Sequence, residues 1–375
     1  KQLPYEIVKE YIGAALNGVN YHQLFPYKQP EDGDAFRVIL GDFVTTEDGT
    51  GIVHLAPSFG ADDNLVAKQN GIGSLTLVDG QGRFTEEVTD LAGQYVKEEF
   101  YTEKDEKPKY PADVQIVINL KDKNQLFKSE KYEHSYPHCW RTDKPILYYP
   151  MDSWFVKTTD YKKRMMELNN TINWKPKSTG EGRFGNWLEN LVDWNLSRSR
   201  FWGIPIPIWR TEDGEEEICI SSVEMLQDEV EKSVAAGIMT TNPLSEFEVG
   251  NFSEENYNTF DLHRPYVDDI VLVSSEGKVM KRELDLIDVW FDSGSMPYAQ
   301  LHYPFENKEL FKQNYPADFI AEGVDQTRGW FFTLHAISTM LFDSVAYKNV
   351  ISNGLVLDKN GNKMSKRLGN ATDPF

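Results

Sequence analysis

The sequence has few cysteines, a deficit of basic residues and no long apolar run, and each absence excludes a class of protein. Two cysteines, Cys139 and Cys219, among 375 residues cannot form a disulfide framework and favour a reducing, cytoplasmic compartment. No apolar run reaches the roughly 18–20 residues that span a bilayer, and no signal segment opens the chain, so no membrane association is expected. The 39 Lys and Arg against 59 Asp and Glu give a formal charge of −20, which argues against indiscriminate nucleic-acid binding.

The length and composition predict several folded domains. At roughly 150 residues per domain, 375 residues correspond to two or three domains. The apolar fraction of 40% and the aromatic fraction of 13% suffice for buried cores, which excludes a wholly disordered chain. Because the chain begins at Lys1 without Met and stops at Phe375 shortly after a Gly-Asn pair, we expect a piece of a longer protein. A processed chain is the alternative.

Residues 36–57 have the pattern of a β-hairpin. Apolar runs at 36–40 and 51–55 flank the turn-forming Glu-Asp-Gly at 47–49, so we predict two strands and a β-rich first part of the chain. A short helix is expected from Asp63, where apolar residues follow possible Asp caps.

The middle of the chain has a different pattern. Aromatic residues and leucines recur at helical spacing over 184–194 and predict one buried helix face. Pro205 and Pro207 restrict the apolar stretch 201–209 to an edge strand or an extended connector. Residues 211–260 are acidic and loosely patterned, which predicts a solvent-rich insertion.

The last 90 residues predict a βαβ unit. A short apolar strand at 318–321 leads to Glu322-Gly323, a helix from about Thr327 carries an apolar stripe that includes Leu341, and a second strand covers 350–357. Sheets of this kind bind ligands beyond the carboxyl ends of their strands. We therefore expect an α/β fold.

The sharpest motif is Lys363-Met-Ser-Lys-Arg367, which lies between two glycines. Lys363 and Lys366 are three residues apart, so a turn would place both ammonium groups on one side. Two mobile cations suit a triphosphate whose α-phosphorus is attacked while pyrophosphate leaves. A solvated basic loop is the alternative interpretation.

A second motif, Glu322-Gly-Val-Asp-Gln326, falls at the predicted strand-to-helix turn. Gly323 allows a ligand to approach the backbone closely. Asp325 can accept hydrogen bonds from ribose hydroxyls, and Glu322 can accept them from an ammonium or hydroxyl group. A helix N-cap role for Asp325 is the alternative.

Two further pairs are candidates for substrate contacts. Trp290 and Trp330 could form flat apolar walls around an aliphatic substrate, or they could be core residues. Asp63 follows His54 by nine residues, so its carboxylate could hold an α-ammonium group while the imidazole contacts a ribose or an ester. A satisfied histidine and a helix-capping aspartate are the alternative.

Together these motifs resemble the class I aminoacyl-tRNA synthetases, in particular their isoleucine-specific branch. The basic motif is similar to the family's Lys-Met-Ser-Lys-Ser signature, with Arg367 in the last place. The resemblance runs along the whole chain, through Gly49-Thr-Gly-Ile-Val-His-Leu-Ala-Pro57, His134-Ser-Tyr-Pro-His-Cys-Trp-Arg141, Leu196-Ser-Arg-Ser-Arg-Phe-Trp-Gly203 and Asp325-Gln-Thr-Arg-Gly-Trp330. The valyl and leucyl branches share the architecture. Two segments favour isoleucine: His134-Ser-Tyr-Pro-His-Cys-Trp-Arg141 and Trp290-Phe-Asp-Ser-Gly-Ser-Met-Pro297.

The resemblance implies two activities. Synthesis would join isoleucine to ATP, supplied with Mg²⁺, and pass the acyl group to tRNA(Ile). Editing would hydrolyse valyl-tRNA at a second site, because one missing methylene changes binding too little for one pocket to discriminate, isoleucine against valine being the standard example. By position, the implied residues are Lys363 and Lys366 for catalysis on ATP, Glu322, Gly323, Asp325, Gln326 and Lys366 for the adenylate, Trp290 and Trp330 for the isoleucine pocket, and His54 and Asp63 for editing.

The resemblance also implies domain boundaries. Residues 1–135 would be the editing domain without its N-terminal part, 136–210 would return into the catalytic domain, 211–283 would be an acidic insertion, and 284–375 would be the C-terminal half of a Rossmann-like catalytic domain. The family's first signature, His-Ile-Gly-His, is absent from the sequence, and the Thr-rich editing strand is expected before residue 1. We therefore expect the piece alone to be inactive in synthesis, and the enzyme to be a monomer.

No structural zinc is expected in this segment. Many bacterial relatives bind zinc through Cys-x-x-Cys pairs, but here Thr142 stands where the partner of Cys139 would be. The loops at 211–219 and 274–279 contain only Cys219.

Three other functions stay open. A stand-alone aminoacyl-tRNA deacylase or tRNA-binding module would account for the absent first signature, although it would leave the intact basic motif without ATP to bind. A valyl- or leucyl-type synthetase would share the architecture. Another class I nucleotidyl-transferring ligase would share the basic motif but not the first 140 residues.

Overall fold

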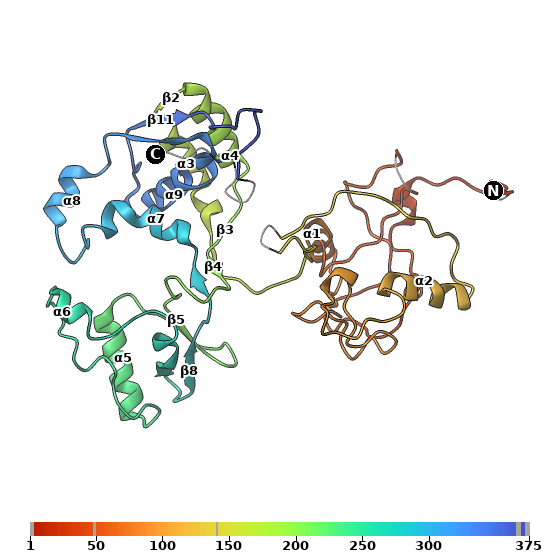
Figure 1. Ribbon diagram of the computed structural model, residues 1–375, viewed down its shortest axis with the longest axis horizontal. Helices are drawn as coiled ribbons and strands as arrows, with labels where there is room; N and C mark the ends of the chain where they lie inside the picture. Colours follow the sequence, from red (N-terminus) through yellow and green to blue (C-terminus); the bar gives the residue numbers. More distant parts are fainter. Residues whose placement is uncertain (1–3, 48–49, 140–141, 365–368, 372–375) are drawn as a thin grey trace. The chain divides into compact units, whose positions relative to one another are not determined.

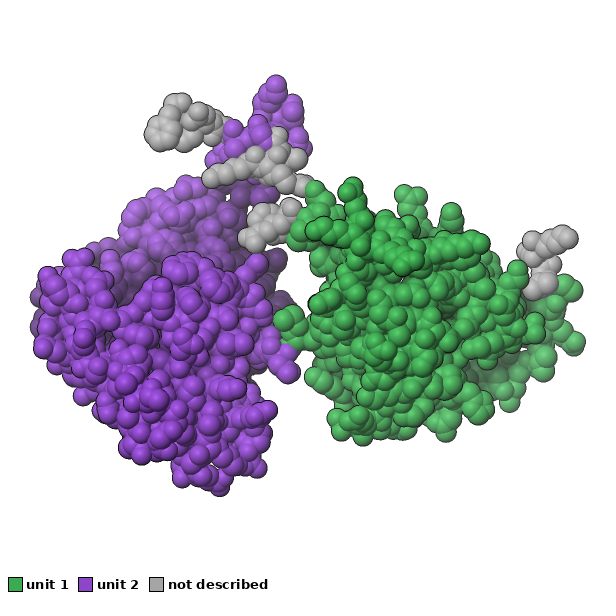
Figure 2. Space-filling view, turned by 60° about the horizontal axis from the view of Figure 1, so that its bottom comes forward, with its two compact units in different colours: residues 1–151 green, residues 152–375 purple. Residues whose placement is uncertain are grey.

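The computed structural model describes residues 4–47, 50–139, 142–364 and 369–371. The chain divides into two compact units, unit 1 (residues 1–151) and unit 2 (residues 152–375), which are coloured separately in Figure 2. Within the described residues, no helix is long and apolar enough to cross a membrane.

The described residues of unit 1 form two α-helices, which are joined by long connecting segments (Figure 1). They are α1 (Ala61–Gln69) and α2 (Ala112–Asp122), and single turns of 3-10 helix lie at Gly13–Leu16 and Glu98–Phe100. The predicted short helix is confirmed as α1, but it begins at Ala61. Asp63 therefore lies in the first turn, where a negative charge favours the helix dipole, rather than at the cap. The sequence patterns above do not predict α2.

The strands predicted at 36–40 and 51–55 are absent from the described part of unit 1. Phe36 has a φ of 56°, which interrupts an extended run at its first residue. The following residues pair with an earlier segment, since the N–H of Val38 donates to the carbonyl of Val19 at 2.9 Å. The hairpin prediction was wrong because a strand depends on its partner, and the run at 36–40 pairs with 18–21 instead. Of the expected β-rich character, the described residues of unit 1 retain only isolated bridges.

A three-stranded parallel sheet forms the centre of one part of unit 2 (Figure 1). Its strands, in spatial order, are β10 (Ile320–Gly323), β11 (Asn349–Asn353) and β2 (Asn173–Lys175). The connection from β10 to β11 runs through the 3-10 helix η6 (Val324–Arg328) and the helix α9 (Trp330–Phe342). The parallel pairing confirms the predicted βαβ unit and the α/β fold class.

A buried core lies between this sheet and the helices α3 (Lys162–Asn169), α4 (Gly185–Glu189) and α9. Trp174 of β2 meets the ring of Phe331 edge-on, with centroids 5.6 Å apart, and its indole N–H donates to the Asn169 side chain at 2.9 Å. A Cβ at Gly180, in the π-helical segment η4 (Thr179–Phe184), would lie 2.3 Å from the Trp174 ring. The core therefore requires glycine at position 180.

The predicted apolar stripes agree with the core only in part. Phe184, Leu188 and Leu191 are buried as expected, but α4 ends at Glu189 and Trp194 lies in a strand, so a helix face covers only part of 184–194. α9 is buried at every position from Phe331 to Thr339, whereas Leu341 near its end is 60% exposed. A single stripe was thus too narrow a prediction, because α9 is covered on all sides.

Residues 208–282 form a second core, which the loose sequence pattern did not predict. An antiparallel sheet has the order β6 (Glu217–Cys219), β5 (Ile208–Thr211), β8 (Val279–Arg282) and β7 (Val271–Val273), and α5 (Val223–Ala235) packs on it. Trp209 is buried and donates its indole N–H to the carbonyl of Ile270 at 2.8 Å. β5 is an interior strand that begins after Pro207, so the prolines lie in an extended connector and not in an edge strand.

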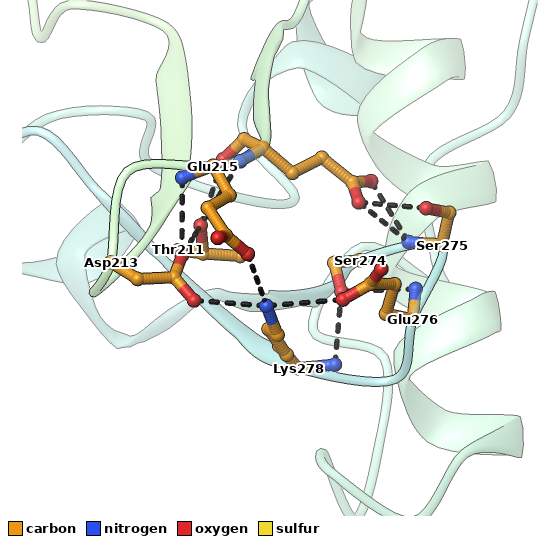
Figure 3. A network of polar contacts seen from close by, with 8 residues as sticks. Thr211, Asp213, Glu215, Ser274, Ser275, Glu276 and Lys278 are labelled. Carbon is orange, nitrogen blue, oxygen red and sulfur yellow. Dashed lines mark hydrogen bonds and ion pairs between the residues drawn. The ribbon is translucent and has the colours of Figure 1, made fainter.

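An ion cluster joins two hairpin turns of this antiparallel sheet, as Figure 3 shows. The ammonium of Lys278 lies 2.9 Å from Asp213, 2.7 Å from Glu215 and 3.0 Å from Glu276. These carboxylates, Glu215 foremost, raise the pKa of Lys278 above its usual range. The Lys278 side chain therefore links its own turn to the turn that carries Asp213 and Glu215.

Among the remaining described elements of unit 2, α7 has 11 residues and the others have 7 or fewer. They are the paired strands β1 (Phe155–Val156) with β3 (Trp194–Asn195) and β4 (Ser197–Arg198) with β9 (Leu286–Ile287), the helices α6 (Glu254–Tyr257), α7 (Val289–Ala299) and α8 (Lys308–Asn314), and the 3-10 turns Thr158–Tyr161 and Tyr266–Asp269.

Candidate functional site

The turn after β10 places three predicted residues at the carboxyl end of a parallel strand. Glu322 and Gly323 end the strand, and Asp325 lies in η6, with both carboxylate side chains exposed. A Cβ on Gly323 would come within 2.6 Å of the Asp325 carboxylate, so the glycine lets this side chain fold back against the turn. This edge of a parallel sheet is where such folds bind ligands.

Gln326 links this turn to the start of α9. Its side-chain carbonyl accepts the N–H of Trp330 at 2.9 Å, and its amide donates to the Asp325 carboxylate at 3.3 Å. A Cβ on Gly329 would lie 2.7 Å from the same carbonyl. Gln326 thus satisfies an otherwise unpaired helix donor and orients Asp325 at the same time.

The two predicted pocket tryptophans lie on the neighbouring helices α7 and α9. Trp330 donates its indole N–H to the carbonyl of Ser293 in α7 at 2.9 Å. Trp290 is 39% exposed and approaches the backbone at Gly329, where an added Cβ would lie 3.4 Å from its ring. The helices can approach because Gly294 faces α9, where a Cβ would lie 2.8 Å from Ile337. The structure therefore brings Trp290 and Trp330 together beside the turn after β10.

A buried carboxylate, which sequence reasoning missed, supports the start of α7. Asp288 accepts the N–H of Trp290 at 3.3 Å and pairs with Arg198 at 2.7 Å. The indole N–H of Trp194 donates to the same carboxylate at 3.1 Å. Ninety residues separate Arg198 from Asp288 in sequence, so no local pattern could have indicated the pair.

Asp292 lies one turn further along α7 in a less favourable position. Burial, and then the nearby charge of Asp288, raises the pKa of the Asp292 carboxyl above its usual value. One of its oxygens is buried without a hydrogen-bond partner in the described part of the chain. The start of α7 therefore has a well-paired carboxylate at its N-cap, Asp288, and a poorly solvated one, Asp292, in its first turn.

The structure describes the predicted basic motif only at its start. Lys363 is exposed and forms an isolated bridge with Leu357, across a turn closed by Asp358. The Asp358 carboxylate accepts the amide of Asn370 at 2.9 Å and the N–H of Asn362 at 2.8 Å. These bonds, that of Asn370 first, lower the pKa of Asp358. Lys366 and Arg367 lie outside the described residues.

In unit 1, Asp63 is engaged by its own loop. Its carboxylate accepts the N–H of Ala56 at 2.9 Å, and a Cβ on Gly60 would lie 2.8 Å from it. His54 is exposed, and among the described residues no hydrogen bond joins it to Asp63. The two predicted editing residues therefore flank the loop 56–60: His54 precedes it, and Asp63 lies in the first turn of the helix that follows it.

A short chain of hydroxyl groups, also missed from sequence, holds the same loop from the other side. Thr76 donates to the buried Ser58 hydroxyl at 2.9 Å, and Ser58 and Ser74 share a hydrogen bond at 2.8 Å. Asn64 of α1 donates to the carbonyl of Pro57 at 2.9 Å. Loop 56–60 is thus fixed by side chains on both flanks.

Within the described residues, no group of three or more His, Cys, Asp or Glu side chains could hold a metal ion. Cys139 belongs to unit 1 and Cys219 to unit 2. The absence of structural zinc stays a prediction.

Residues 88–375 match the sequence profile of the class I tRNA synthetases (I, L, M and V), and the chain belongs to this family. Similar relatives are named isoleucine–tRNA ligase. The chain is 65% identical to that of Cytophaga hutchinsonii and 62% identical to that of Bacteroides fragilis, with its whole length covered in both cases. It spans about a third of those relatives, 34% and 35% of their length.

Among solved structures, the chain is similar to Mycobacterium tuberculosis methionyl-tRNA synthetase in complex with methionyl-adenylate. The match covers 64% of this chain and 33% of that chain, with 16% identity and a TM-score of 0.35. An overlap this weak adds nothing to the family assignment.

Proposed function

We propose that this chain is part of an enzyme that ligates isoleucine to tRNA(Ile) through an isoleucyl-adenylate. The observation that carries the proposal is the turn after β10, where Glu322, Gly323 and Asp325 meet the carboxyl end of a parallel strand beside Trp290 and Trp330. The names of the similar relatives support the choice of amino acid.

In the proposed reaction, the isoleucine carboxylate attacks the α-phosphorus of ATP, and pyrophosphate leaves with its Mg²⁺. Asp325, held by Gln326, would accept the ribose hydroxyls, and Glu322 would accept a hydrogen bond from the ammonium or hydroxyl groups of the adenylate. Lys363 and Lys366 would neutralise the charge that develops on the phosphates. The indole faces of Trp290 and Trp330 would pack on the aliphatic side chain. A hydroxyl of the tRNA 3′ end would then attack the acyl carbon and lose its proton, so that the ester bond forms, the bond from the acyl carbon to the phosphate oxygen breaks, and AMP leaves.

We further propose that unit 1 edits valyl-tRNA by hydrolysis. Support comes from the loop 56–60 between His54 and Asp63, which side chains hold on both flanks. The domain boundaries at 135, 210 and 283 remain part of the proposal, as do a monomeric state and a cytoplasmic location.

The chain alone should not activate isoleucine, because it lacks the His-Ile-Gly-His signature. Isoleucine-dependent ATP–pyrophosphate exchange by these 375 residues alone would contradict this part of the proposal.

A pair of substitutions in the longer protein separates the two activities. Lys366→Ala should depress adenylate formation, measured by ATP–pyrophosphate exchange, with little effect on deacylation of valyl-tRNA. Asp63→Ala should allow valyl-tRNA to accumulate while isoleucine activation survives. Equal loss of both activities in either variant would indicate misfolding, and unchanged deacylation in Asp63→Ala would remove that residue from the editing site.

A further inference from the structure

The turn after β10 is held by a segment that is distant in sequence and to which the proposed function assigns no role. The segment consists of η4 and α4, which border the same core as α9 (Figure 1). It is itself fixed in that core, because Phe184 is fully buried and the side-chain amide of Asn169 donates to the carbonyl of Gly180 at 3.1 Å. The segment can therefore act as a rigid support for its neighbours.

One arginine of this segment bonds directly to the turn. The Nε–H group of Arg183 donates to the hydroxyl of Thr327 in η6 at 2.9 Å, and the same hydroxyl donates to the carbonyl of Val324 at 2.8 Å. Thr327 is fully buried, so its hydroxyl depends on these two partners. Of the hydrogen bonds that η6 side chains form within the described part of the chain, this one alone comes from a distant segment, 144 residues away.

A second arginine makes the reverse contact. The guanidinium of Arg328, at the end of η6, lies 5.1 Å from the centre of the Trp187 ring in α4. A cation over an aromatic face is attracted to it. Trp187 also meets the ring of Phe332 in α9 edge-on, with centroids 6.0 Å apart. The two segments are thus joined twice, by one arginine from each.

The hydrogen bond from Arg183 bears on the geometry of the proposed adenylate site. Asp325 lies between Val324 and Thr327, the two residues that the Thr327 hydroxyl joins, and Gln326 orients its carboxylate. The five residues of η6 make a short 3-10 turn, which has little stability of its own. Because a displacement of about 1 Å is enough to impair a binding or catalytic group, the support of the turn matters for the ligand.

We propose that Arg183 is a positioning residue of the adenylate site, which holds Thr327 and through it fixes the place of Asp325. The ligand rests on the proposed function, whereas the contact between the two segments does not depend on it. Since Arg183 is exposed, its loss should change the order of the turn more than the stability of the whole chain.

The first test is hydrogen exchange of the full chain. Arg183→Met removes the donor, so exchange at residues 324–330 should quicken by about five-fold or more, while the thermal midpoint changes little. Lys177→Met is the matched control, because Lys177 is another exposed cation, lies just before η4 and pairs with Glu181 at 2.7 Å. Equal exchange at 324–330 in the unchanged chain and Arg183→Met would overturn the inference.

The second test is the affinity of the longer protein for a non-hydrolysable isoleucyl-adenylate analogue, measured by calorimetry. Arg183→Met should weaken binding by about five-fold or more, and Thr327→Val should do the same. The double variant should bind no more weakly than either single variant, because both substitutions remove the same hydrogen bond. Arg183→Lys should recover part of the affinity, since an ammonium can also donate to the hydroxyl.

The outcomes separate the positioning role from the proposed function. Unchanged affinity in Arg183→Met would overturn the positioning role. A loss in Arg183→Met without one in Thr327→Val would also overturn it, because Arg183 would then contact the ligand itself. Faster exchange at 324–330 in a protein that does not bind the analogue would support Arg183 as the support of the turn and overturn the proposed ligand.

Discussion

The turn after β10 and the loop at 54–63 are held in place in different ways. The first leads into α9, which is buried along most of its length, and glycines at 323, 329 and 294 allow side chains and helices to pack tightly around it. The second belongs to a unit with few regular elements, and a few hydrogen bonds to α1, Ser74 and Thr76 hold it. A site attached to a core inherits the stability of that core, whereas a site on a loop depends on a few polar contacts.

The largest effect should come from removing the aromatic centre of the unit 2 core. Trp174→Ala should reduce the free energy of unfolding by about 3–5 kcal/mol, because it leaves a large cavity beside Phe331. Hydrogen exchange should quicken in α9 and β2 while α1 and α2 are unchanged. Trp202→Ala, at a position 68% exposed, is the matched control. If hydrogen exchange in α1 quickened as much as in α9, the claim that the two regions are stabilised separately would be contradicted.

The second-largest effect should be a pH dependence of the stability of the same core. Burial lowers the pKa of His335 to about 4, and the ring nitrogen Nε2 lies 2.8 Å from the carbonyl of Met165. The unfolded chain binds this proton more readily, so stability should fall by about 3 kcal/mol as the pH drops from about 6.5 to about 4. Denaturant titrations across this range measure the slope. His335→Gln should flatten it, and an unchanged slope in that variant would remove His335 as the cause.

The loop of unit 1 should respond more weakly. Ser58→Ala removes a buried hydroxyl that bonds to Ser74 and Thr76, and should cost about 1 kcal/mol. Amide exchange should quicken in residues 56–60 and remain unchanged around β10. Ser129→Ala, at an exposed position of the same unit, provides the control. If exchange around β10 quickened as much as in the loop, the two regions would not be independent.

The smallest effect is expected at the exposed ion cluster around Lys278. Lys278→Met should lower the thermal midpoint slightly at low salt, and the difference from the unchanged chain should shrink as salt screens the charges. Lys278→Arg should restore most of the stability. A difference independent of salt would mean that packing, not charge, holds the turns.

The sequence predicted best where local pattern and tertiary structure agree. The βαβ unit was found because apolar runs and the Glu322-Gly323 turn are local signals, and the stripe at Phe184 and Leu188 lies in the core as expected. The prediction of strands at 36–40 and 51–55 was wrong because the pairing of a strand depends on segments outside the local pattern.

Long-range contacts account for the parts of the sites that sequence reasoning did not find. The pair Arg198–Asp288 joins residues far apart in the chain, and the hydroxyl chain at Ser58 has no periodic signature. Trp290 and Trp330 could be named from sequence, but their approach depends on Gly294, whose role appears only when α7 meets α9.

The most direct test of the central claim is the affinity of the longer protein for a non-hydrolysable isoleucyl-adenylate analogue, measured by calorimetry. If the turn after β10 binds the adenylate, Asp325→Ala should weaken the analogue about ten-fold or more, because charged hydrogen bonds to the ribose are lost. Asp63→Ala, in the other unit, should bind it like the unchanged protein. Equal affinity of the unchanged protein and Asp325→Ala would contradict the account.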